Sequence, residues 1–165
     1  MKFALALCPA LLIAGTAVAA PREAPYRAVG TEPGWALTIE NGLILIGECV
    51  DPFSVEAVRA SMGALFTVPI VQAEWADFVP WLRAGPGQLV GLSLDTDQDY
   101  RAATYTAPTF LLTGNEAQGM PSDYAAECDL LVKIPMLGKA DSLNAAVATA
   151  VMAYEVLART KPSPR

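Results

Sequence analysis

The sequence contains no histidine, and this absence removes several classes of catalytic site. Ser-His-Asp and Cys-His nucleophilic sites, histidine proton shuttles and most zinc or iron centres all need an imidazole. The cysteines are Cys8, Cys49 and Cys128, too few for a four-thiolate metal site and too widely spaced for a CxxC redox pair. We therefore expect no bound metal and no disulfide framework.

Positive charge is also scarce, because 11 Lys and Arg oppose 17 Asp and Glu, which gives a net charge of −6. Broad attraction to nucleic-acid phosphates is therefore not expected, and any contact with nucleic acid must rely on a local basic patch. Hydrophobic residues make up 53% of the 165-residue chain, enough for one packed domain of ordinary size.

Residues 1–20 have the pattern of a secretory signal. Lys2 precedes an apolar run, and residues 17–19 provide the A-x-A pattern of a cleavage site. The run is shorter than the roughly 20 apolar residues that span a bilayer, so we expect no membrane span in the mature chain. A buried hydrophobic helix is the alternative, which Pro9 and Gly15 disfavour.

Residues 21–42 are turn-rich and include one short alternating strand pattern at residues 36–39. The letters at residues 26–39, YRAVGTEPGWALTI, resemble the opening of small bacterial secreted or lipoprotein-like proteins of uncharacterised function. This short motif implies no chemistry. We interpret residues 21–42 as a linker of different origin from the domain that follows.

From residue 43 onward, short apolar runs alternate with helical patterns. The predicted strands are residues 43–46, 67–71, 89–94, 110–112 and 130–132. Ser54 can cap a helix that continues to Met62, and residues 74–83 predict a second helix that bends or ends at Pro80. Alternation of strands and helices favours an α/β fold with a mostly parallel sheet.

The last predicted helix has the clearest periodicity, and Ser142 can cap it. Its apolar stripe consists of Leu143, Val147, Ala150, Val151, Tyr154 and Leu157. Alanines elsewhere keep the helix thin, so another backbone can approach closely. Periodicity alone favours a plain core helix whose stripe faces the sheet.

Two loops that follow strands are the candidate ligand site, because ligands bind at the carboxyl ends of strands in open parallel sheets. Residues 112–120 contain glycines that let the backbone turn tightly, together with the carboxylate of Glu116. In residues 134–144, Pro135 stiffens the turn, and main-chain groups can hydrogen-bond a flat heterocycle.

The two loops carry the letters G-N-E-x-Q-G and I-P-M-x-G-x-x-x-S-L-N. Together they resemble the second and third motifs of the SpoU (TrmH-type) branch of the SPOUT RNA methyltransferases. The resemblance extends upstream through residues 51–66 and covers residues 43–158. It implies a SPOUT-type parallel α/β sheet with helices on both faces and a C-terminal trefoil knot.

The resemblance also implies a reaction: transfer of a methyl group from S-adenosylmethionine to a ribose 2′-hydroxyl of tRNA or rRNA. The implied cofactor-binding residues are Leu92, Gly114, Ile134, Met136 and Leu143. The implied catalytic residues are Glu116, Ser142 and Asn144. Each of these three has a structural alternative, respectively a solvated carboxylate, a helix cap and an amide that satisfies nearby backbone. Family members dimerise through the C-terminal helix, so a homodimer is expected.

The first family motif, N-x-G-x-x-x-R, is missing. Its arginine is thought to activate the hydroxyl, but residues 31–35 contain none, and Arg27 stands in the secreted-protein pattern. We therefore expect a methyltransferase domain at residues 43–160 that lacks its first strand–helix unit, followed by a tail at residues 161–165. Residues 36–39 are a candidate replacement for the lost strand.

The charge of the predicted domain is also unfavourable for RNA binding. Residues 43–158 contain 5 Lys and Arg against 14 Asp and Glu, a net charge of −9. Such a surface repels RNA unless basic side chains cluster, so weak RNA binding is expected. Three interpretations stay open: a cytoplasmic RNA methyltransferase, a remnant that binds the cofactor or dimerises without methyl transfer, and a small exported protein defined by its leader.

Overall fold

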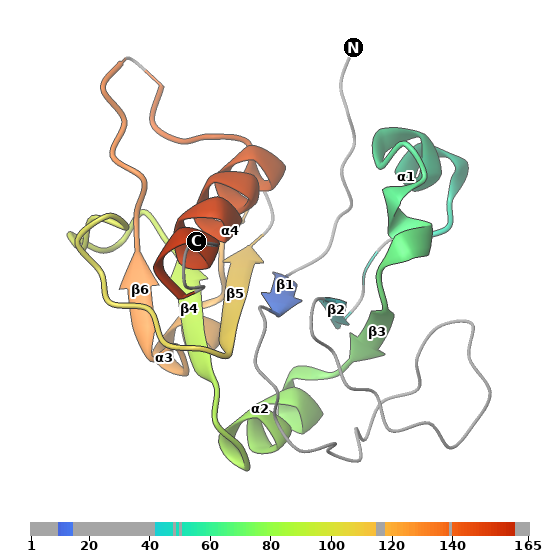
Figure 1. The fold of residues 1–165 in the computed structure, drawn as a ribbon, viewed down its shortest axis with the longest axis horizontal. Helices are drawn as coiled ribbons and strands as arrows, with labels where there is room; N and C mark the ends of the chain where they lie inside the picture. The colour runs from blue at the N-terminus through green and yellow to red at the C-terminus, as the bar shows by residue number, and fades with distance from the viewer. Residues whose placement is uncertain are drawn as a thin grey trace, which may run out of the picture.

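The computed structural model describes residues 10–14, 42–47, 49, 51–114, 118–138 and 140–160. Its six-stranded sheet has the order β3-β2-β1-β5-β4-β6 (Figure 1). The strands are β1 (Ala10–Ala14), β2 (Gly42–Ile46), β3 (Ile70–Ala73), β4 (Gln88–Leu92), β5 (Thr109–Gly114) and β6 (Leu130–Val132). All run in one direction except β1, which is antiparallel to both of its neighbours.

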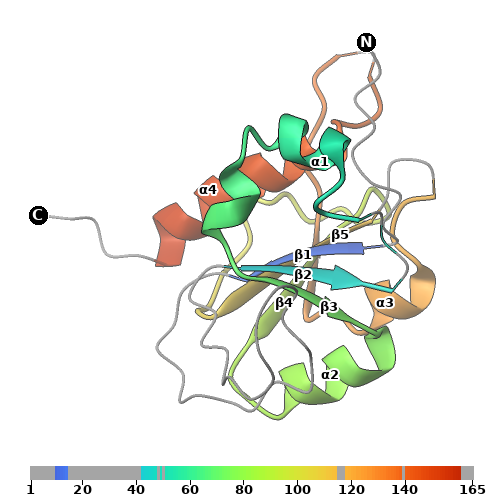
Figure 2. The ribbon, with the colours of Figure 1, turned by 90° about the vertical axis from the view of Figure 1, so that its right-hand side faces the viewer.

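Helices cover both faces of this sheet, as Figure 2 shows. They are α1 (Val55–Ala60), α2 (Trp75–Arg83), α3 (Ser122–Ala126) and α4 (Ala145–Thr160), with a 3-10 turn η1 (Ala64–Thr67) after α1. One face carries α1 and α4, and the other carries α2 and α3. This two-sided cover is the α/β arrangement that the sequence predicted.

The core lies against both faces because the central strands are apolar at nearly every position. In β5, Phe110 and Leu112 pack toward Phe78 of α2, whereas Leu111 packs toward Met152 of α4. Successive side chains of a strand point to opposite faces, so a strand covered on both sides must be continuously hydrophobic. A third, smaller cluster joins Leu65 of η1 to β2 and β3.

Most predicted elements are present, with shifts at their ends. β6 occupies the predicted residues, and the Ser54 hydroxyl accepts a hydrogen bond from the Ala57 N–H at 3.2 Å, which confirms the cap of α1. The strand predicted at residues 67–71 begins three residues later, because residues 64–67 form η1. Helix α2 continues past Pro80 to Arg83.

The predicted cap of α4 is wrong, and so is the core-facing stripe that periodicity alone favoured, an orientation that the family resemblance had already replaced with a dimer contact. The helix begins at Ala145, and its N-terminal cap is Asn144 rather than Ser142: the Asn144 Oδ1 accepts hydrogen bonds from two backbone N–H groups of the first turn. The buried residues of α4 are Thr149, Met152 and Val156, so the predicted stripe does not face the sheet. Alanines occur on all sides of α4, so the helix has small apolar side chains all round. Periodicity alone therefore could not predict which side packs against the sheet.

The strand beside β2 also differs from the prediction. Residues 36–39 lie outside the described residues, but both edges of β2 are already paired, one with β3 and the other with β1. The neighbouring strand therefore comes from the apolar run of the N-terminal leader. Cys49, just after β2, is disulfide-bonded. No helix within the described part of the chain is long and apolar enough to cross a membrane.

Candidate cofactor site

The carboxyl ends of β4, β5 and β6 meet at one edge of the sheet, where a cavity of about 680 Å³ opens. Both loops that the sequence singled out contribute to it. The described lining consists of Leu92, Ser93, Leu94, Asp95, Thr113, Gly114, Gln118, Gly119, Met120, Val132, Lys133, Ile134, Ser142, Leu143, Asn144, Ala145 and Ala148. Its volume lies within the range of roughly 300–1,000 Å³ that is usual for small-molecule sites.

The first loop folds back tightly on the end of β5. A Cβ atom at Gly114 would overlap the backbone of Gly119 and Met120, so no other residue type fits there without moving the loop. Gly119 itself has φ +71°, in the left-handed region that favours glycine. The two glycines therefore let the returning backbone form one wall of the cavity.

The second loop ends at the N-terminus of α4, beside the cavity. The Asn144 Oδ1 accepts hydrogen bonds from Ala146 N at 3.0 Å and Val147 N at 3.3 Å. These bonds fix the Asn144 amide at the start of the helix, and Ala145 and Ala148 of the first turn line the cavity. A helix N-terminus carries partial positive charge, so this wall is favourable for electronegative ligand atoms.

The structure brings together six of the eight predicted site residues: Leu92, Gly114, Ile134, Ser142, Leu143 and Asn144 line the same cavity. Met136 is half-buried in the second loop but is absent from the lining. Glu116 lies outside the described residues, as do Arg27 and residues 31–35 of the missing motif. The catalytic and binding roles of these residues stay predictions.

Lys133 lines the cavity but was not among the predicted site residues. Its Nζ donates a hydrogen bond to the Asp97 carboxylate at 2.8 Å, and this bond and the lysine charge lower the pKa of Asp97. Lys133 directly follows β6, so the rule that ligands bind at the carboxyl ends of strands could have found it.

Lys133 and Arg101 offer RNA little uncompensated positive charge. Each is paired with its own carboxylate, Lys133 with Asp97 and Arg101 with Asp99 at 2.7 Å. Arg59 is exposed on α1, and Lys139 lies outside the described residues. The cavity edge is thus locally neutralised rather than strongly basic.

The fold and the motif loops agree with comparisons to known proteins. A profile of the SpoU rRNA Methylase family matches residues 36–154. This chain belongs to the SpoU rRNA methylase family. A 23S rRNA (uridine(2479)-2'-O)-methyltransferase of Streptomyces viridochromogenes is 40% identical over 123 residues, which cover 71% of this chain and 43% of the relative. RlmP of Bacillus subtilis, a 23S rRNA (guanosine(2553)-2'-O)-methyltransferase, is 28% identical over 70% of this chain and 47% of its own length.

Solved structures give the same fold. The AdoMet-bound rRNA methyltransferase from Sinorhizobium meliloti matches with a TM-score of 0.69 and 45% identity over 73% of this chain and 47% of that one. AviRb from Streptomyces viridochromogenes, a SpoU methyltransferase solved with AdoMet, matches with a TM-score of 0.66 and 37% identity, covering 72% of this chain and 49% of that chain. The SPOUT-type α/β fold is confirmed, whereas the trefoil knot stays a prediction. This chain spans about half the length of these relatives.

Proposed function

We propose that this domain transfers a methyl group from S-adenosylmethionine to a ribose 2′-hydroxyl of tRNA or rRNA. The observation that carries the proposal is the cavity that both motif loops line together at the carboxyl ends of β4, β5 and β6. The proposal is also supported by the family to which the chain belongs and by relatives whose structures were solved with AdoMet bound.

The residues present fit this cofactor. Leu92, Ile134 and Leu143 offer apolar surface for a flat purine ring, and the neighbouring main chain of the second loop offers hydrogen-bonding groups to its edge. The loop wall of the cavity requires glycine at position 114, because a Cβ there would overlap the backbone of Gly119 and Met120. When bound, S-adenosylmethionine supplies an electrophilic methyl group on its sulfonium sulfur.

The polar residues of the cavity orient the reactants. Ser142 and Asn144 stand at the start of α4, where the cap bonds hold the Asn144 side chain in one position. Fixed groups of this kind align a weak nucleophile such as a ribose hydroxyl with the methyl carbon, which lowers the entropic part of the barrier. For Glu116 we propose the orienting role that the family resemblance implies.

A second candidate function is cofactor binding without methyl transfer. The family arginine that activates the hydroxyl has no counterpart at residues 31–35. Among the described arginines, Arg83, Arg101 and Arg159 are engaged in ion pairs with nearby carboxylates. Arg59 is exposed on α1. Unless Arg59 or another group activates the hydroxyl, the domain would hold the cofactor unreacted.

RNA is the proposed partner, and the cytoplasm, where RNA and S-adenosylmethionine are found, is the proposed location. Export remains the alternative that the leader pattern of residues 1–20 favours. The acidic balance of the domain requires that RNA contact be local or that a partner supply basic groups.

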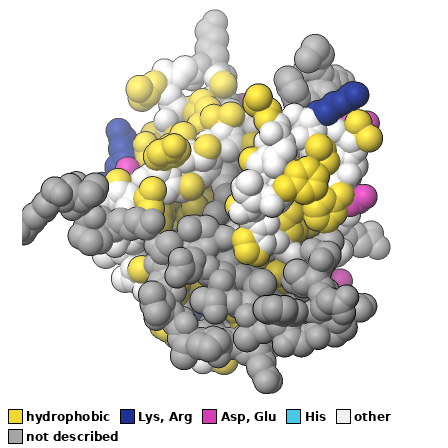
Figure 3. All heavy atoms as spheres, turned by 45° about the vertical axis from the view of Figure 1, so that its right-hand side comes forward, with side chains coloured by type: hydrophobic (Ala, Val, Ile, Leu, Met, Phe, Trp, Pro, Cys, Tyr) yellow, Lys and Arg dark blue, Asp and Glu magenta, His cyan; other side chains and the backbone are white. Residues whose placement is uncertain are grey.

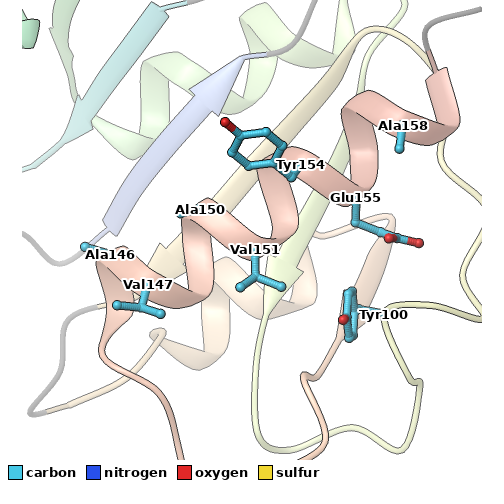
Figure 4. Close-up of a pocket in the computed structure, with 8 residues that line it drawn as sticks. All are labelled: Tyr100, Ala146, Val147, Ala150, Val151, Tyr154, Glu155 and Ala158. Carbon is cyan, nitrogen blue, oxygen red and sulfur yellow. The ribbon is translucent and has the colours of Figure 1, made fainter. Parts of the chain in front are cut away.

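A homodimer through α4 is proposed on the outer face of that helix. Val147, Ala150, Val151 and Tyr154 border a shallow hollow of about 790 Å³, with Tyr100 beside the helix (Figure 4). Tyr154 is 77% exposed and Val147 is 50% exposed, so this predicted apolar stripe is open to a partner. Figure 3 shows hydrophobic side chains at the surface over α4 and over α1. An exposed apolar stripe of this kind is typical of a protein contact site.

Methyl transfer is tested by incubating the full chain with bulk rRNA or tRNA and S-adenosylmethionine that carries a tritiated methyl group. The expected result is label in 2′-O-methylated nucleosides after nuclease digestion. Label that is absent although the cofactor binds would replace the leading proposal with the second candidate. Absence of both binding and label would overturn both.

A further inference from the structure

The strand at the centre of the sheet comes from the N-terminal apolar run. In β1, Ala10 lies opposite Ile46 of β2 and Gly114 of β5, and Leu12 lies opposite Ile44 and Leu112 in the same way. The pairing runs through all five residues on both edges. β1 is thus a fully paired interior strand rather than an addition at the sheet edge.

Among the described strands, β1 is the sole link between the two parts of the sheet. β2 pairs elsewhere with β3, and β5 pairs elsewhere with β4, which pairs with β6. Without β1, the sheet would separate into a β3-β2 pair and a β5-β4-β6 group. Their facing edges would then present unpaired backbone N–H and C=O groups, which are costly when buried and promote aggregation when exposed.

The position of β1 also affects the cofactor cavity. Ala10 pairs with Gly114, the residue at which the first motif loop folds back. Thr113 and Gly114 of β5 both line the cavity, so the free edge of β5 would adjoin one cavity wall. Loss of β1 would therefore loosen the cofactor site as well as the sheet.

The same residues form the apolar run of the secretory-signal pattern. A segment that is hydrogen-bonded on both edges in the folded protein is not accessible as a signal there, and a chain that began at Ala20 would have no β1. We propose that Ala10–Ala14 is a permanent structural strand, and that the integrity of the sheet and of the cofactor cavity depends on its retention.

Hydrogen exchange of the full chain tests this proposal without any assay of methyl transfer, so its failure and that of the proposed function are distinguishable. Backbone amides of residues 10–14 are expected to exchange as slowly as those of β5, since both belong to the sheet interior. Exchange of residues 10–14 at the rate of an unstructured peptide would overturn the proposal. So would protection of residues 36–39 in their place.

A pair of variants at Leu12 supplies the second test. Leu12→Pro removes one backbone N–H from β1, whereas Leu12→Ala keeps it and serves as the matched control. The proline variant is expected to speed amide exchange in β2 and β5 at least about tenfold beyond the alanine variant, which loses side-chain volume but keeps the backbone N–H. Unchanged exchange in the proline variant would overturn the proposal. A proline variant that does not fold, beside an alanine variant that does, would support it.

Discussion

At the scale of single residues, the cavity depends most directly on Gly114. The backbone of Gly119 and Met120 occupies the space that a Cβ would need, and backbone cannot move aside as a flexible side chain can. The sequence predicted correctly that Gly114 belongs to a tight turn of the first loop. It could not predict that Asn144 rather than Ser142 caps α4, because both residue types are good caps and only the backbone path selects one.

We expect Gly114→Ala to destabilise the fold by about 1–3 kcal/mol, the usual cost of overpacking, and to abolish cofactor binding. The matched control is Gly138→Ala in the second loop, where an added Cβ meets no atom within 4 Å. Thermal unfolding measures the first effect and equilibrium binding of S-adenosylmethionine the second. Equal binding by the two variants would contradict the cavity described above.

Cys128 supplies a pH-dependent prediction. Burial raises the pKa of the Cys128 thiol to about 12, and the negative charge of Asp129 contributes in the same direction. At pH 8 the thiolate is therefore scarce, and we expect alkylation by iodoacetamide about a thousandfold slower than for a thiol of ordinary pKa. Because the folded state favours the protonated thiol, stability is predicted to fall as the pH rises above 9. Peptide mass spectrometry measures the alkylation, and urea should restore the ordinary rate.

At the scale of secondary structure, the sequence predicted the strands better than the faces of the helices. Apolar runs such as residues 110–112 are unambiguous because a strand covered on both faces is hydrophobic throughout. In α4, alanines and valines occur all round the helix, so the buried side at Met152 and Val156 could not be distinguished from the outer stripe. β1 was missed because an apolar run fits a signal segment and a buried strand equally well.

The outer stripe of α4 leads to a prediction about assembly. Tyr154→Asp places a charge in the hollow along α4 and is expected to weaken a homodimer at least about tenfold, since a buried unpaired charge is costly. Leu137→Asp, at a fully exposed loop residue outside the hollow, is the matched control. Light scattering during size-exclusion chromatography measures the masses. A monomeric parent chain, or a dimer unaffected by Tyr154→Asp, would exclude this interface.

At the scale of the whole molecule, the family motifs correctly predicted the fold class and the edge of the sheet where the cavity lies. The net negative charge of this chain opposes binding of RNA, its proposed substrate, which is also negatively charged. We expect weak binding of tRNA to the full chain at low salt, because Lys133 and Arg101 are paired with carboxylates and the net charge is −6. A filter-binding titration measures the affinity, and tight retention with steep salt dependence would contradict this expectation.

The two motif loops line one cavity, and we propose that this cavity holds a methyl donor. Calorimetric titration of the full chain with S-adenosylmethionine tests it most directly, with Gly138→Ala and Gly114→Ala measured in parallel. We expect saturable binding of one cofactor per chain, retained in Gly138→Ala and lost in Gly114→Ala. Absence of binding to a chain that is folded by its thermal transition would contradict it.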